Sequence, residues 1–110
     1  MSDPSTPPAF VVLCTVPEAQ ADQMVDRLLE ERLVACVNFL GPVRSRYRWQ
    51  GALEEAHEML LLLKTSPAAR ERLRQRIVEL HPYEVPEVLE LGVDSGLPAY
   101  LAWVTECCDG

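Results

Sequence analysis

The stretch VACVNFLGPVRSRYRWQGALEEAHEMLLLLKT, residues 34–65, decides the fold. Its two halves are rich in β-branched, aromatic and leucine residues, and they meet at Gln50-Gly51, a pair that favours a tight turn. The pattern predicts a hairpin of two antiparallel strands, the second running from Glu54 to Thr65. Each strand would be two to three times the usual length of ~5–6 residues. The hairpin must therefore extend beyond the rest of its sheet.

The chain before this hairpin predicts a strand and a helix. FVVLCT, Phe10–Thr15, is a short apolar and β-branched run of the kind found in buried strands. Thr15 and Glu18 are spaced as in a capping box, which predicts the start of a helix. Apolar residues then repeat at helical spacing with acidic residues opposite: Ala21, Met24, Val25, Leu28 and Leu29.

The chain after the hairpin predicts a second helix, a fourth strand and a terminal helix. Ser66 is expected to cap the second helix, with Pro67 in its first turn, and His81-Pro82 ends it. Val85–Val93 predicts the strand, and apolar residues between 97 and 107 fit a short amphipathic helix.

The element order predicts an α+β fold, a ferredoxin-like β-α-β-β-α-β sandwich with a C-terminal helix and a long hairpin between its second and third strands. We expect one domain over residues 10–107, because this length suffices for a single core. Residues 1–9 are interpreted as a disordered lead and 108–110 as a frayed tail. An overhanging hairpin would expose strand edges and apolar surface, so we expect it to pair with other copies of the chain in a closed ring.

Composition excludes several classes of function. Ten basic and seventeen acidic side chains give a net charge of −7, which argues against nucleic-acid binding because that requires a basic face. No apolar run reaches the ~20 residues of a membrane span. The N-terminal residues lack the features of a secretory signal, so a cytoplasmic protein without membrane contacts is expected. Motifs for phosphate loops, nucleophile elbows and zinc hydrolases are missing, and an enzyme is not expected.

Three residues are candidate metal ligands, each with a structural alternative. Cys14 and Cys36 lie in apolar strands, where a cysteine also serves as a small buried hydrophobe. His81 ends a helix, where it could instead bond the last helical carbonyl groups. Their spacing matches no metal motif, so the fold would have to assemble the site.

Aromatic and charged residues of the hairpin are candidates for a second kind of site. Tyr47 and Trp49 are two apart on a strand and so share a face, where they could pack between copies of the chain or stack on a ligand. Glu58 and Lys64 lie on one side of the returning strand by the same argument. Either could form an ion pair across a subunit boundary.

Several stretches together resemble one family, the CutA divalent-cation tolerance proteins. The matching segments cover residues 10–105 and are VVLCTVP (11–17), EERLVACVN (30–38), S-x-Y-x-W-x-G (45–51), E-x5-KT (58–65), HPYEVPE (81–87) and YLAW (100–103). The resemblance implies a ferredoxin-like subunit in a homotrimer that is similar to the PII signalling proteins. Cysteine and histidine positions to which this family's copper or other divalent ions are assigned correspond here to Cys14 and His81. Leu80 stands where some members have a second histidine, so a tetrahedral site needs Cys36, water or another subunit as well.

Two hypotheses about function follow. In the first, the chain forms a trimeric protein that binds copper or another divalent cation, zinc being the alternative, and contributes to metal tolerance. In the second, a PII-like trimer binds a small anionic ligand or a partner in a cleft between subunits. The residues expected at that cleft are Tyr47, Trp49, Glu58, Lys64 and Tyr83, with His81 beside them.

Overall fold

The computed structural model describes residues 5–108 and has the predicted α+β fold. A four-stranded antiparallel sheet has the order β2-β3-β1-β4, as expected for a ferredoxin-like sandwich. Its elements are β1 (Phe10–Pro17), α1 (Glu18–Glu30), β2 (Cys36–Trp49), β3 (Ala52–Thr65), α2 (Arg70–Leu80), β4 (Val88–Gly92) and α3 (Pro98–Cys107). The element order confirms the fold class that the sequence predicts.

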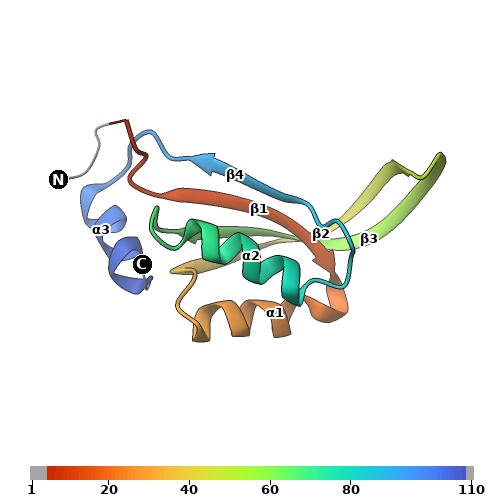
Figure 1. The fold of residues 1–110 in the computed structure, drawn as a ribbon, viewed down its shortest axis with the longest axis horizontal. Helices are drawn as coiled ribbons and strands as arrows, with labels where there is room; N and C mark the ends of the chain where they lie inside the picture. The colour runs from red at the N-terminus through yellow and green to blue at the C-terminus, as the bar shows by residue number, and fades with distance from the viewer. Residues whose placement is uncertain (1–4, 109–110) are drawn as a thin grey trace.

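Helices α1 and α2 both lie on one face of the sheet, and α3 lies at the end opposite the hairpin tip (Figure 1). The core fills the space between the sheet and these two helices, because alternate side chains of a strand point to the same face. Leu28 of α1 and Ile77 of α2 are fully buried there. The sheet contributes Val12, Cys14, Val16, Leu61 and Leu63.

The other face of the sheet, called the open face below, is also apolar. Its central residues are Val11, Leu13, Leu60, Leu62, Leu89 and Leu91, which pair in rows across β4, β1 and β3. Leu89 and Leu91 are 54% and 51% exposed, although leucines of this kind are usually buried. A single subunit therefore leaves a contiguous apolar surface in contact with water.

The β2–β3 hairpin extends beyond the rest of the sheet, as its length predicts (Figure 1). Both strands have 14 residues, but β1 pairs with β3 only as far as Glu58. Residues 52–57 therefore pair with β2 alone within the described part of the chain. The turn uses Gln50 and Gly51 with positive φ, and the pairing shifts by one residue between Phe39 and Gly41.

Both predicted helix starts are wrong by a few residues. β1 continues through Thr15 to Pro17, because Thr15 pairs with Leu60 in the sheet instead of capping a helix. Helix α2 begins at Arg70, not at Pro67, and the Ser66 hydroxyl accepts a hydrogen bond from the Ala69 amide at 3.1 Å. Ser66 thus closes the turn before the helix. The fourth strand is also shorter than expected, because residues 85–87 form a loop before β4.

Residues at both ends of the predicted domain pack more closely than the sequence indicates. Residues 1–4 and 109–110, which fall in the expected lead and tail, lie outside the described residues. Ala9 is 4% exposed, and its carbonyl accepts a hydrogen bond from the Val93 amide at 3.0 Å. Cys108 is 8% exposed. Ala9 and Cys108 therefore pack against the domain, and the expected lead and tail otherwise stay predictions.

Candidate functional site

The structure separates the two candidate cysteine ligands. Cys14 pairs with Leu61 on β3 and is fully buried on the helix side of the sheet. Cys36 pairs with Lys64, whose side chain is on the open face, and directly paired residues share a face. Cys14 and Cys36 therefore lie on opposite sides of the sheet and cannot bind one metal ion together.

Cys14 and His81, called the core pair below, do come together. The Cys14 thiol donates a hydrogen bond to the Thr15 carbonyl oxygen at 3.7 Å, and His81 Nε2 lies 2.7 Å from the same oxygen. β1 positions the cysteine, and the end of α2 positions the histidine. The fold thus brings one thiol and one imidazole to a common point inside the protein.

Both ring nitrogens of His81 are used within the chain. The Tyr83 amide donates a hydrogen bond to Nδ1 at 3.1 Å, so Nδ1 carries a lone pair. Nε2 then carries the proton and donates it to the Thr15 carbonyl. His81 is 7% exposed, and both of its ring nitrogens have hydrogen-bond partners within the chain. A metal could bind His81 only by replacing one of these hydrogen bonds.

The Cys14 thiol is held in its protonated form. Burial, followed by the negative charges of Glu87 and Glu58, raises the pKa of Cys14 to about 12. Metals bind the thiolate, so a metal at this position must displace the proton. Among residues 5–108, no group of three or more histidine, cysteine and acidic side chains is placed to hold a metal ion. The core pair alone supplies two ligands.

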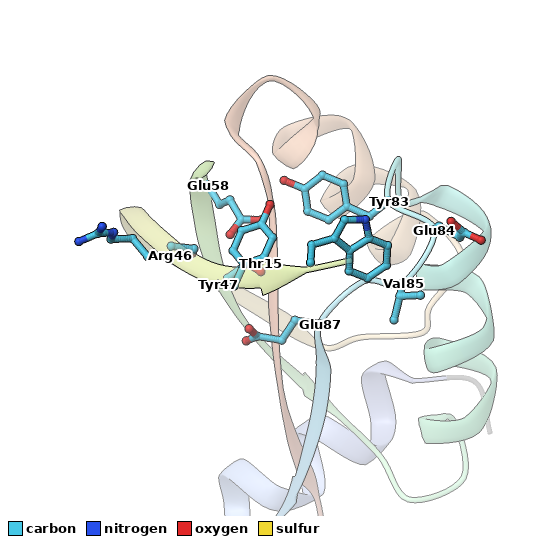
Figure 2. Close-up of a pocket in the computed structure, with 10 residues that line it drawn as sticks. Thr15, Arg46, Tyr47, Glu58, Tyr83, Glu84, Val85 and Glu87 are labelled. Carbon is cyan, nitrogen blue, oxygen red and sulfur yellow. The ribbon is translucent and has the colours of Figure 1, made fainter. Parts of the chain in front are cut away.

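A separate cavity lies on the open face, and its lining follows the hairpin from Glu58 to Trp49 (Figure 2). It has a volume of about 640 Å³, within the range of small-molecule sites. Four segments contribute to it: β1, β2, β3 and the loop between α2 and β4. We call it the open-face pocket, and its lining residues are Thr15, Ser45, Arg46, Tyr47, Trp49, Glu58, Tyr83, Glu84, Val85 and Glu87.

Four of the five residues expected at a cleft line this pocket: Tyr47, Trp49, Glu58 and Tyr83. Lys64 does not, although it shares a face with Glu58 as predicted. The two residues are six positions apart on β3, or roughly 20 Å at the usual rise of a strand. Lys64 instead hydrogen-bonds Asn38 and lies 3.8 Å from the Cys36 sulfur.

Glu58 is the most buried charged side chain of the pocket, with 4% of its surface exposed. The Tyr83 hydroxyl donates a hydrogen bond to its carboxylate. Burial, together with this bond and the charge of Glu58, raises the pKa of Tyr83 to about 12. The backbone amide of Tyr83 donates a hydrogen bond to His81, and the centroids of the two rings lie 4.8 Å apart. The core pair thus supports one wall of the pocket.

The charge of the pocket is negative. Glu58, Glu84 and Glu87 line it, and Arg46 is the one basic lining residue. Arg46 lies 3.5 Å from Glu55 and is directed away from the other labelled residues (Figure 2). Sequence reasoning did not select Glu87 or Thr15 for this site. Thr15 could have been found from strand pairing, because it lies opposite Leu60, two residues from Glu58, whereas the loop that carries Glu87 has no periodic signal.

Comparisons with known proteins agree with the fold. The family model for the CutA1 divalent ion tolerance protein matches residues 10–107. The divalent-cation tolerance protein CutA of Pectobacterium atrosepticum is 41% identical over 105 residues, which cover 94% of this chain and 96% of that relative.

Solved structures give the same result. The divalent cation tolerance protein from Thermus thermophilus has a TM-score of 0.87 at 45% identity, covering 92% of this chain and 99% of that one. The PII-like protein CutA from Nostoc has a TM-score of 0.87 at 38% identity, covering 91% and 97%. With a family match over almost its whole length, this chain belongs to the CutA1 divalent ion tolerance protein family.

Proposed function

We propose that the protein acts in tolerance to divalent cations as a cytoplasmic homotrimer that binds copper or zinc. The observation that carries the assembly is the uncovered apolar open face beside an overhanging hairpin. Leu89 and Leu91 remain about half exposed in the single subunit, and the hairpin strands have free edges beyond Glu58. Apolar surface and free strand edges of this kind are usually covered by another chain.

Metal binding is supported by the core pair. A thiol and an imidazole are ligands that suit copper and zinc better than magnesium. Both groups contact the Thr15 carbonyl, so a small movement of His81 would bring them to one ion. The ion must displace the proton of Cys14, and its apparent affinity should rise with pH. Water or another ligand completes the coordination.

Native mass spectrometry of the reduced protein tests both parts. We expect a trimer at micromolar concentration that retains copper or zinc against a competing thiol. The double variant Cys14→Ser with His81→Gln should remain trimeric and lose the metal. Cys36→Ser is the matched control, because this thiol lies on the other side of the sheet. A monomer would contradict the assembly, and unchanged metal binding in the double variant would contradict the core pair.

A second candidate function is that of a PII-like trimeric module that binds a small ligand. The open-face pocket favours it, because a cavity of about 640 Å³ with a buried carboxylate is not needed for a metal site at the core pair. Ligands bound to the folded state stabilise it. Thermal protection by a small molecule, without protection by copper or zinc, would favour this function over metal binding.

A further inference from the structure

The two hydrogen bonds of the His81 ring fix which of its nitrogens carries the proton. The Tyr83 amide can only donate, so Nδ1, which lies 3.1 Å away, accepts with its lone pair. The Thr15 carbonyl can only accept, so Nε2, which lies 2.7 Å from it, donates. Together the two bonds require the tautomer with its proton on Nε2.

A metal ion at His81 cannot leave this arrangement intact. If the ion binds Nδ1, it takes the lone pair that the Tyr83 amide uses. If it binds Nε2, the proton must move to Nδ1, because a neutral imidazole keeps one N–H group. The N–H groups of Nδ1 and of Tyr83 would then face each other without an acceptor. Ligation through either nitrogen therefore breaks the bond between His81 and the Tyr83 amide.

The loop that follows His81 is held mainly through Tyr83. Within the described part of the chain, residues 82–86 make no backbone–backbone hydrogen bond. Tyr83 makes three contacts instead: its amide bonds His81, its ring lies 4.8 Å from the His81 ring, and its hydroxyl donates to Glu58. Ligation removes the first contact, and any movement of the imidazole towards an ion disturbs the second. The bond to Glu58 alone cannot keep the loop in the same position.

We infer that metal ligation of His81 switches residues 82–87 from this attached state to a second state, in which the Tyr83 hydroxyl has left Glu58. The inference rests on the proposed metal binding at the core pair and adds how that binding is transmitted. Tyr83 and Glu87 line the open-face pocket, on the side of the sheet that other copies of the chain are proposed to cover (Figure 2). Occupancy of a site inside one subunit thus reaches the boundary between subunits.

Coupling of this kind is reciprocal, which gives the inference a signed prediction. The contacts that hold Tyr83 in the attached state oppose metal binding, because the ion must break them. Removing the Tyr83 hydroxyl should therefore strengthen zinc binding, although the hydroxyl is not a ligand of the core pair. One hydrogen bond of ordinary strength corresponds to about fivefold in affinity. If Tyr83 had only a structural role, its hydroxyl would not oppose zinc binding.

Selective ¹⁵N labelling of tyrosine tests the movement of the loop. The chain has three tyrosines, so the labelled protein gives three amide signals, and Tyr83→Phe identifies the signal of Tyr83. We expect stoichiometric zinc to shift this signal and to speed its hydrogen exchange by ~10-fold or more, while Tyr100 on α3 stays unchanged. Cys14→Ser is the matched control, because it keeps both bonds of His81 and lacks the thiol. In this variant zinc should leave the Tyr83 amide unchanged.

Zinc affinity, measured by competition with a chelating dye, tests the coupling. We expect Tyr83→Phe to bind zinc about fivefold more tightly than the unmodified protein. Tyr100→Phe, which loses a hydroxyl on α3, is the matched control and should not change the affinity. Circular dichroism and native mass spectrometry confirm that each variant is folded and assembled like the unmodified protein.

Two outcomes would overturn the switch and leave metal binding in place. The first is bound zinc with an unchanged Tyr83 amide. The second is bound zinc with equal or weaker affinity in Tyr83→Phe. If the protein and its variants retained no zinc or copper, the proposed metal function would fail and the switch with it. The two kinds of failure are therefore distinguishable.

Discussion

The core pair and the open-face pocket lie on opposite sides of the sheet and differ in how their polar groups are satisfied. Around the core pair, His81 uses both ring nitrogens within the chain, and the Cys14 thiol is protonated and fully buried. In the pocket, Glu58 is buried beside a cavity and has no positive partner in the described chain. Within one described subunit, the polar groups of the first region bond to each other, whereas no basic side chain pairs with Glu58. Judged by residue type alone, the thiol and imidazole of the core pair would have been chosen as the ligand site before the pocket.

The largest expected effects come from shortening a leucine on each face of the sheet. Leu61→Ala, beside Cys14, should lower the free energy of unfolding by ~3 kcal/mol because it leaves a cavity in the core. Leu89→Ala, on the open face, should instead dissociate the proposed trimer at concentrations where the unmodified protein stays assembled. Urea denaturation and light scattering over a range of protein concentrations measure both. An unchanged oligomeric state in Leu89→Ala would remove the open face from the assembly.

The next effect concerns the hydrogen bonds of His81. His81→Leu leaves the Thr15 carbonyl and the Tyr83 amide without their partner, and we expect a loss of stability of about 2 kcal/mol. His57→Leu is the matched control, because the His57 side chain is 75% exposed and should contribute within ~0.5 kcal/mol. Urea denaturation at neutral pH measures both. Similar small losses would show that the bonds of His81 do not stabilise the core.

A smaller effect on stability is expected at Tyr83, which contacts both His81 and Glu58. Tyr83→Phe keeps the ring and removes the hydroxyl that bonds Glu58, so we expect a loss of about 1 kcal/mol. Tyr47→Phe should have less effect, because Tyr47 is 43% exposed. The comparison is made by denaturation of both variants. If Tyr47→Phe were the more destabilising change, Glu58 would depend on the hairpin and not on the loop.

The smallest expected effect on stability at neutral pH comes from the protonation of Cys14, which changes the free energy of unfolding only at alkaline pH. Cys14 has a pKa of about 12 in the folded protein and 9.0 ordinarily, so the unfolded state holds fewer protons between these values. The stability of the metal-free protein should therefore be complete below pH 9 and fall as the pH rises towards 12. Cys14→Ala should make this decline shallower, and Cys36→Ala should not. Denaturation curves across this pH range decide the point, and an identical decline in both variants would contradict it.

Periodicity in the sequence predicted the element order and the placement of Tyr47 and Trp49 on one strand face. It also placed Glu58 and Lys64 on the same face. The six positions between them correspond to roughly 20 Å along one strand, so Lys64 does not line the same pocket as Glu58 within one subunit. A place for Lys64 at a cleft between subunits stays a prediction.

The assignment of Cys14, Cys36 and His81 to one site failed for a different reason. Whether two cysteines on different strands share a face depends on the register between strands, which neither segment encodes alone. The Cys36–Lys64 and Cys14–Leu61 pairings set that register only in the folded sheet. Thr15 likewise fits a helix cap locally, but pairing with Leu60 in the sheet prevails.

The one-residue shift between Phe39 and Gly41 changes which residues of β2 face each side of the sheet. Before it, the even-numbered residue Asn38 faces the open side with Leu62; after it, the odd-numbered Val43 does so with Glu58. If Leu40 paired in the ladder instead of forming this bulge, simple alternation would continue and the two faces of the protruding arm would be exchanged. The arginines at 44, 46 and 48 would then replace Tyr47 and Trp49 at the pocket. One unpaired residue that does not line the pocket thus determines whether arginines or aromatic residues face it.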